Sequence, residues 1–347
     1  MLTSRTNQMT RRTFLGLASG AIAAPVFGKS DSASLILGQG DFRYRVVPSW
    51  GQLGDETPVE NCHGIVCDRE GHIILLTDQI KNNVIIYDAA GKLVHKWGTT
   101  FPGAHGLSLV MENGREVLYI TDLKRHKVFK TSTSGEILNE WGWPQSTGKY
   151  EKEDEYRPSW TLHHPDGSFF ILDGYGKDYI SQHDTEGKFV KIFGGKEGGI
   201  AHWGPHGGVM DTRKMDDVTM LVAMSDKQHL LRLDLVGNKR QTIAMPGGNP
   251  RQIRLHKNHF FVAHLGDHWP ADPHCRGFIS VLDAELRVIS NIAGSPPLYD
   301  DKGILQTMCH QEEIFQHPHD LVVDPQENLY VAQFNSSRTY PIKLERV

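Results

Sequence analysis

Long apolar runs, helical periodicity and a strong charge of one sign are all missing from this sequence. No segment beyond the N-terminus approaches the ~20 apolar residues of a membrane-spanning helix, so we expect the mature protein to be free of the membrane. A formal net charge of −4 gives no electrostatic footprint for nucleic acid. The 347 residues are 39% hydrophobic and 22% charged, which excludes a disordered chain and allows two domains or one large all-β unit.

Cysteine is also scarce, with four residues in the chain. Cys62 and Cys67 lie on one predicted strand and point to opposite faces, so they cannot pair with each other. Cys275 and Cys309 both fall in loop-like segments and are the pair that a disulfide could join. Glycine and histidine are frequent instead, at 35 and 19 residues, which favours many turns and raises the question of a metal.

The N-terminal stretch MTRRTFLGLASGAIAAPVFG (9–28) has the pattern of an export signal. Arg11 and Arg12 precede a short apolar stretch that ends in small residues. This order is typical of a twin-arginine signal, and the alternative is a disordered, basic N-terminus. We therefore expect a signal over residues 1–30, a linker over 31–40, and a periplasmic or extracellular protein. Because this route exports folded proteins, often with a cofactor loaded, it also favours a metal.

A unit of four short strands joined by DxxG-type turns recurs along the rest of the chain, at a period of roughly 40–50 residues. The start of each unit is a turn followed by a short apolar strand, at residues 61–78, 103–122, 157–174, 204–226, 249–267 and 317–333. Repetition of this kind predicts an all-β, six-bladed β-propeller with NHL-type repeats over residues 41–347. The rival, a two-sheet sandwich, leaves the repetition unexplained. The last unit shows three strands, so FRYRVVPSW (42–50) is expected to supply the fourth and close the ring.

The residue that opens the innermost strand of each unit shows a second regularity. Innermost strands line the channel of a propeller, so these residues should form a ring at one mouth: His63, His105, Ser159, His206, Arg251 and His319. Units two, four and six all contribute histidine, at threefold-related positions. Three imidazoles with a fourth position open form a catalytic zinc site, and they suit zinc better than calcium or magnesium. The alternative is a set of histidines that only cap backbone groups, and His63 shows that the position accepts histidine outside the threefold set.

The loop LDGYGKD (172–178) is expected at the same mouth. The first strand of a blade leaves this mouth and the second strand returns to it, so the loop after the second strand lies beside the ring. This places Tyr175 near the metal. At this point Tyr175 could be either a catalytic residue or a packed surface residue.

The motifs around these residues resemble peptidyl-α-hydroxyglycine α-amidating lyase. The matching segments run in the same order over nearly all of residues 60–335, and the strongest are AHGLSLVMENGREVLYITDLKRHKVFK (104–130), DGYGKDYISQHDTEGKFVKIFGG (173–195) and HPHDLVVDPQENLYVA (317–332). The resemblance implies a propeller with zinc on His105, His206 and His319, and Tyr175 as catalytic residue. It also implies a structural calcium on the axis, held by Asp320 and the backbone carbonyls of Ile65 and Leu107.

The sequence departs from this family where the substrate would be recognised. One family arginine has Asp78 near its place, and a second is matched by Lys227 or Asp226. Gly176 stands where the family has one cysteine of a disulfide. Arg251, on the ring, is the candidate replacement charge. The departures affect recognition of a peptide carboxylate more than metal binding.

These residues predict a zinc-dependent lyase that cleaves the C–N bond of a carbinolamide-type substrate to an amide and an aldehyde such as glyoxylate. The metal would lower the pKa of the substrate hydroxyl, and Tyr175 would act as general base. The alternatives are a non-catalytic NHL propeller that binds a protein or glycan, and a zinc-dependent lyase or hydrolase of another substrate. We expect a small molecule or a peptide terminus as the partner, and a monomeric protein.

Overall fold

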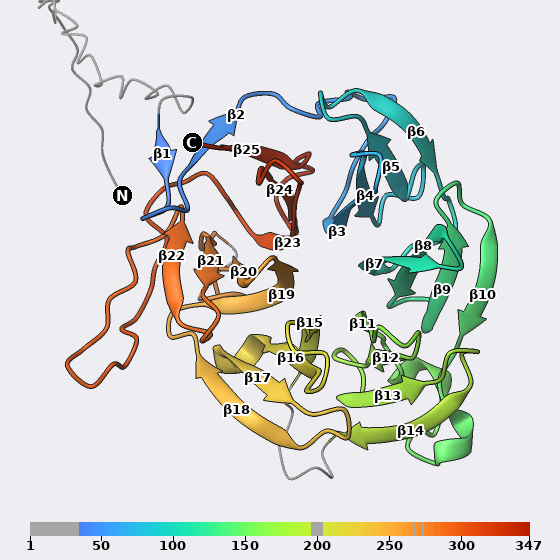
Figure 1. Ribbon diagram of the computed structural model, residues 1–347. Coiled ribbons are helices and arrows are strands. Elements are labelled where there is room, and N and C mark those ends of the chain that lie inside the picture. The colour runs from blue at the N-terminus through green and yellow to red at the C-terminus, as the bar shows by residue number, and fades with distance from the viewer. Residues whose placement is uncertain (1–34, 196–203, 267, 273) are drawn as a thin grey trace, which may run out of the picture.

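The computed structural model describes residues 35–195, 204–266, 268–272 and 274–347. Six antiparallel sheets surround a central axis, and the innermost strands β3, β7, β11, β15, β19 and β23 face that axis (Figure 1). The predicted all-β six-bladed propeller is therefore confirmed. No helix in the described part of the chain has the length and apolar character to cross a membrane. The predicted export signal lies outside the described residues.

Blades one to five each consist of four strands in chain order from the axis outward. Blade one has β3 (Cys62–Cys67), β4 (Ile73–Thr77), β5 (Val84–Tyr87) and β6 (Leu93–Trp97). Blade two has β7 (Ala104–Glu112), β8 (Arg115–Asp122), β9 (Lys127–Ser132) and β10 (Ile137–Trp141). Blade three has β11 (Trp160–His163), β12 (Phe169–Leu172), β13 (Tyr179–His183) and β14 (Phe189–Gly194). Blade four has β15 (Pro205–Asp211), β16 (Thr219–Met224), β17 (His229–Leu233) and β18 (Lys239–Ala244). Blade five has β19 (Asn249–His256), β20 (His259–Leu265), β21 (Ile279–Leu282) and β22 (Val288–Ile292). The short 3-10 helices described are η2 (Gln145–Thr147), η3 (Glu153–Glu155) and η5 (Ser225–Lys227).

Blade six joins the two ends of the described chain. Its inner strands are β23 (Pro318–Val323), β24 (Leu329–Gln333) and β25 (Ile342–Arg346), and β2 (Tyr44–Val47) pairs with β25 as the fourth strand. The N-terminal strand thus closes the ring as the sequence predicted. A fifth strand, β1 (Ile36–Leu37), pairs with β2 inside the segment expected to be a linker, and Leu37 is buried against Tyr44.

The core consists of layers between neighbouring blades. The middle strands are apolar on both faces because each blade is covered on two sides, and Phe170, Met220 and Leu231 from blades three and four share one such layer. Most of the outermost strands are exposed, with β10 and β18 as the clearest cases, whereas β22 is largely buried. This gradient explains why the sequence shows clear apolar runs for the inner strands only.

The DxxG turns work through their aspartates. The Asp88 carboxylate accepts hydrogen bonds from the backbone N–H groups of Ala90 and Lys92, at 2.9 Å each, and Gly91 takes a positive φ of 85°. The Asp68, Asp184 and Asp234 turns repeat this pattern. The repeat found in the sequence is therefore a local hydrogen-bonding unit.

None of the four cysteines, all of which lie in the described residues, forms a disulfide. Cys275 is buried and Cys309 is exposed, so the bridge that the sequence allowed between them is not formed.

Stability should fall in acid because His264 is buried as a neutral imidazole. Burial lowers its pKa from 6.5 to about 3. Below pH 6.5 the unfolded chain binds a proton that the folded chain does not, so stability is lost as the pH falls. Between pH 7 and pH 5 the free energy of unfolding should fall in both proteins. We expect the fall to be about 2 kcal/mol smaller in His264→Gln than in wild type, as measured by urea unfolding. The exposed His95→Gln is the control, and an equal loss in His264→Gln would contradict the prediction.

Candidate metal centre

Five of the six ring residues lie on bulges of the innermost strands, and Ser159 is the exception. The pairing of β3 with β4 shifts register between Cys62 and Gly64, which leaves His63 without a partner in the ladder. Equivalent shifts skip His105, His206, Arg251 and His319 in their strands. A bulge leaves its extra residue unpaired and redirects that side chain. The bulges therefore bring these side chains to the axis from the second or third position of each strand, where the sequence had placed them at the first.

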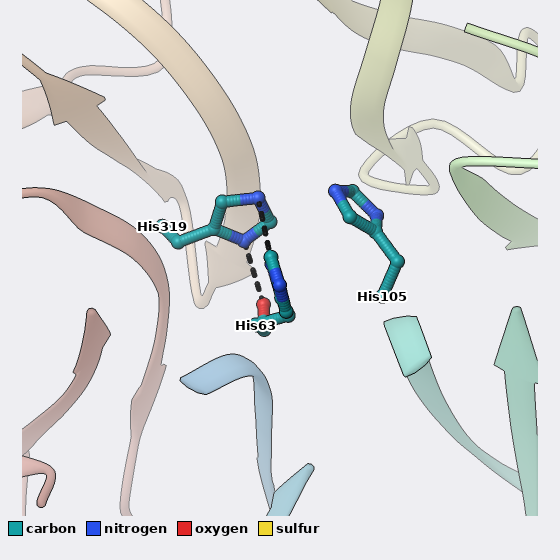
Figure 2. A group of neighbouring side chains, drawn as sticks. All are labelled: His63, His105 and His319. Carbon is teal, nitrogen blue, oxygen red and sulfur yellow. Dashed lines mark hydrogen bonds between the residues drawn. The ribbon is translucent and has the colours of Figure 1, made fainter. Parts of the chain in front are cut away.

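Four imidazoles gather on the axis. The ring centroids of His63, His105 and His319 lie 4.7–4.8 Å apart (Figure 2). The ring of His206 lies 4.9 Å from those of His105 and His319. All four are buried, and nitrogen atoms of His63, His105 and His319 lie within 4.8 Å of one another, a set that could hold a metal ion. The structure thus brings the three predicted zinc ligands together and adds His63.

Three of these histidines repeat one hydrogen bond. Nδ1 of His105 donates to the Ser159 carbonyl at 2.9 Å, and Nδ1 of His206 donates to the Arg251 carbonyl at 3.1 Å. Nδ1 of His319 donates to the His63 carbonyl at 2.7 Å, as Figure 2 shows. In each case the acceptor is the ring residue of the next blade. Because a carbonyl only accepts, the bond places the proton on Nδ1 and leaves Nε2 as the ligand atom.

Glycine follows two of these histidines for a steric reason. A Cβ on Gly106 would lie 2.6 Å from the Ser159 carbonyl oxygen, and one on Gly207 would lie 2.4 Å from the Arg251 carbonyl oxygen. These are the same oxygens that accept the imidazole hydrogen bonds. The His-Gly pairs seen in the sequence therefore let the next blade approach closely enough to orient the imidazole.

The imidazoles are held neutral. Burial lowers the pKa of His105, His206 and His319 well below the usual value, and the charge of Arg251 adds to the effect at His206. Burial also lowers the pKa of His63 to about 3. Neutral imidazoles are the form that binds metal, so these side chains could hold a metal ion at neutral pH.

Tyr175 lies at the ring, in the loop between β12 and β13. Its hydroxyl is 2.9 Å from Nε2 of His206, and its ring centroid is 5.1 Å from that of His105. Because Nδ1 of His206 carries the proton, the hydroxyl donates to Nε2. The side chain is 42% exposed, so it is accessible from the mouth of the channel.

Asp173 shapes the loop that carries Tyr175. Its carboxylate accepts hydrogen bonds from the Tyr150 hydroxyl at 2.8 Å and from the backbone N–H groups of Arg157 and Lys177. Burial raises the pKa of Asp173 to about 7. A Cβ on Gly176 would lie 2.1 Å from an Asp173 oxygen, so glycine is needed there. Hydrogen bonds to Asp173 therefore hold this loop without a disulfide.

A cavity of about 500 Å³ opens over the histidines. Its charged and polar wall includes Arg251, which is 6% exposed, and its apolar wall includes Leu265, Trp269 and Phe334. Sequence reasoning missed Phe334, and it considered Trp269 only as one of several loop aromatics that could suit a binding face. Both follow the second strand of a blade, so the rule that placed Tyr175 could have found them.

The positions of the two family arginines lie outside this cavity. The Asp78 carboxylate accepts hydrogen bonds from the backbone and side chain of Asn61, at 2.9 Å each. Lys227 is exposed on η5. Of the described residues that line the cavity, Arg251 is the one with a permanent positive charge.

The predicted calcium ligands Asp320, Ile65 and Leu107 lie close together, but they surround the side chain of Arg254. Nη2 of Arg254 lies 2.5 Å from an Asp320 carboxylate oxygen, 3.1 Å from the Ile65 carbonyl and 3.3 Å from the Leu107 carbonyl. The guanidinium thus occupies the point that the three residues share. With the guanidinium at that point, the residues present do not fit a calcium ion as they lie in this structure.

Comparison with solved structures shows the same architecture. A streptogramin B lyase is similar with a TM-score of 0.57 at 11% identity, over 91% of this chain and 99% of that one. A catalytically inactive variant of virginiamycin B lyase from Staphylococcus aureus, solved with quinupristin, has a TM-score of 0.56 at 12% identity, over 88% of this chain and all of that one. The hydrazine synthase of Kuenenia stuttgartiensis follows at 0.53 and 12%, over 87% and 99%. No family model and no curated protein sequence matches the chain. At such identities the likeness shows the fold alone.

The close approach of neighbouring blades can be tested at Gly207. We expect Gly207→Ala to push the Arg251 carbonyl away from His206, which weakens zinc binding at least tenfold and lowers Tm. Gly142→Ala is the matched control, because a Cβ there meets nothing within 4 Å. Zinc titration with a competing chelator measures the first effect and thermal unfolding the second. Unchanged zinc affinity in Gly207→Ala would show that the hydrogen bond does not orient the ligand.

Proposed function

We propose that this protein is a zinc-dependent lyase that splits the C–N bond of a carbinolamide-type substrate. The observation that carries the proposal is the repeated hydrogen bond from Nδ1 of His105, His206 and His319 to the next blade. That bond aims three neutral Nε2 atoms at the axis, below a cavity of about 500 Å³ that a substrate can enter. Three imidazoles with room for substrate form the donor set of a catalytic zinc.

His63 fits a supporting role better than a ligand role. Its backbone carbonyl orients His319, and its ring packs against that of Phe334 at 5.3 Å. Its Nδ1 lies 3.5 Å from Nε2 of His319. The set of His63, His105 and His319 satisfies the distance condition for a metal, but the threefold orientation favours His206 as the third ligand.

The bound zinc would act as a Lewis acid that lowers the pKa of a substrate hydroxyl. Tyr175, whose oxygen lies among the histidines and is open to the cavity, would act as a phenolate, the form that a neighbouring cation favours, and take the proton of that hydroxyl. The carbonyl of the aldehyde then forms as the C–N bond breaks, and Tyr175 returns the same proton to the nitrogen, which leaves as an amide. The buried Arg251 binds a carboxylate on the same carbon, so the aldehyde product is glyoxylate.

The group on the amide side is accommodated by the apolar wall. Trp269 and Phe334 pack against each other at 5.3 Å and line the cavity. They favour an acyl group or peptide end with an apolar terminus. The resemblance to the amidating lyase family supports this substrate class.

Asp78 and Lys227, which stand where that family has arginines, favour a different way of recognising the substrate carboxylate. We therefore propose as the second candidate a zinc-dependent lyase that acts on another substrate. We also propose that the protein is exported and acts as a monomer.

The metal content of variants tells whether His206 or His63 is the third ligand beside His105 and His319. We expect one zinc per wild-type chain, a loss of most of it in His206→Ala and His105→Ala, and retention in His63→Ala. Elemental analysis of purified protein after dialysis measures this. Retention in His206→Ala with loss in His63→Ala would make His63 the third ligand, and a wild-type protein without zinc would favour a non-catalytic binding propeller.

Activity tests the roles of Tyr175 and Arg251. We expect glyoxylate release from an acyl-α-hydroxyglycine, with kcat reduced by ~10²-fold or more in Tyr175→Phe and zinc retained. Arg251→Gln should mainly raise KM, because it removes the partner of the carboxylate. A substrate that carries an amide instead of the carboxylate is the control, and it should not distinguish Arg251→Gln from wild type. No glyoxylate from the zinc-loaded wild type would refute the substrate assignment.

A further inference from the structure

The axis holds a second buried cluster beneath the histidines, which the proposed function does not use. It is centred on Arg254, on β19 in blade five. The guanidinium reaches across the axis to Asp320 in blade six, Ile65 in blade one and Leu107 in blade two. One side chain therefore joins the innermost strands of four blades.

The hydrogen bonds of this cluster are nearly complete. Nε of Arg254 donates to Asp320 Oδ1 at 2.9 Å and to the Leu321 carbonyl at 3.1 Å, and Nη2 donates to Asp320 Oδ2 at 2.5 Å. The carboxylate also accepts the backbone N–H groups of Ile65 and Leu321, at 2.8 Å and 2.7 Å. The Asp320 side chain is fully buried, and burial raises its pKa while the guanidinium opposes that rise.

The oxygens around the guanidinium form the kind of shell that hard divalent cations prefer. A carboxylate and backbone carbonyls converge from separate strands, and such ligands suit calcium. Their spacing fits hydrogen bonds, however. The oxygens of Asp320, Ile65 and Leu107 lie 2.5–3.3 Å from Nη2, whereas calcium takes ligands at about 2.3–2.6 Å.

The net charge of the cluster also favours a guanidinium over a divalent cation. Asp320 is the carboxylate that faces Arg254 there, so the guanidinium leaves the buried pair neutral, whereas a divalent cation would leave an excess positive charge in a desolvated site. The ring of Trp160, with its centroid 5.3 Å from Cζ of Arg254, adds a favourable contact for a cation.

We propose that Arg254 is a built-in axial cation that replaces a structural divalent ion in this propeller. It ties the first strands of four blades together and holds the backbone at Asp320, next to His319, without any ion from solution. Arg254 is a positioning residue, and among the described residues the axis carries one metal site where a propeller with a calcium would carry two. Calcium content and thermal stability report on this role of Arg254 independently of lyase activity.

The first test uses the wild-type protein loaded with one equivalent of zinc. After dialysis against ~10 mM CaCl₂ and removal of free ions, we expect no retained calcium, and a Tm within about 1 °C of the value in calcium-free buffer. One retained calcium per chain, or a clear rise in Tm with CaCl₂, would overturn the proposal.

The second test removes the guanidinium. Arg254→Ala should lower Tm by roughly 5 °C or more, because it leaves the Asp320 carboxylate buried without a counter-charge. Adding ~10 mM CaCl₂ should recover at least about half of that loss, and MgCl₂ should recover less, since the oxygens then surround a space that calcium fits better. A loss that calcium does not recover, or a Tm equal to that of wild type, would count against the proposal.

Arg213→Ala is the matched control. Arg213 makes a bidentate pair with the buried Asp211, at 2.7 Å and 2.8 Å, and its side chain is 16% exposed against 19% for Arg254. Asp211 keeps Arg232 as a partner, so Arg213→Ala should lose stability that CaCl₂ does not restore. Equal recovery by calcium in both variants would mean a general effect of salt and would overturn the proposal. If Arg254→Ala does not fold, Arg254→Met replaces it in the same test. The calcium content of the wild-type protein also tests the proposal without any variant.

Discussion

The hydrogen bond between a histidine of one blade and the backbone carbonyl of the next is the contact on which the site depends. It requires a bulge to turn the imidazole inward, and at two positions a glycine so that the neighbouring strand can come close. The same contact joins blades two to three, four to five, and six to one. The contacts that hold neighbouring blades together are therefore the same contacts that orient the imidazoles. If two of these blades separated, one imidazole would lose its orientation.

The electrostatics of the axis follow from this packing. The imidazoles are buried and neutral, with Arg251 at the cavity side and Arg254 beneath them. The two arginines lie three positions apart on β19, yet one lies at the mouth and the other points across the channel. Arg254 is paired with Asp320, while Arg251 lies in the wall of the cavity. The two arginines of one strand thus serve opposite ends of the axis.

Much of this arrangement follows from local patterns. The DxxG turns act through hydrogen bonds within five residues, so each hairpin was visible in the sequence, and so was the recurrence that counts the blades. The register of histidine in units two, four and six pointed to the ring, and the direction of the strands placed the Tyr175 loop. The role of Gly176 was not visible, because it depends on the Asp173 carboxylate as packed. The Arg254 cluster was invisible for the same kind of reason, since Asp320 lies 66 residues away and Leu107 lies 147 away.

The sequence by itself determined the repeated hairpins, the number of blades and the supply of imidazoles, because these depend on turns and alternation over a few residues. Tertiary structure decided which nitrogen of each imidazole faces the axis, how closely His63 approaches the other three, and that a guanidinium stands where an ion was expected. Those outcomes arise from contacts between strands of different blades. Such contacts depend on how closely the blades approach at the axis, and no local pattern in the chain specifies that distance.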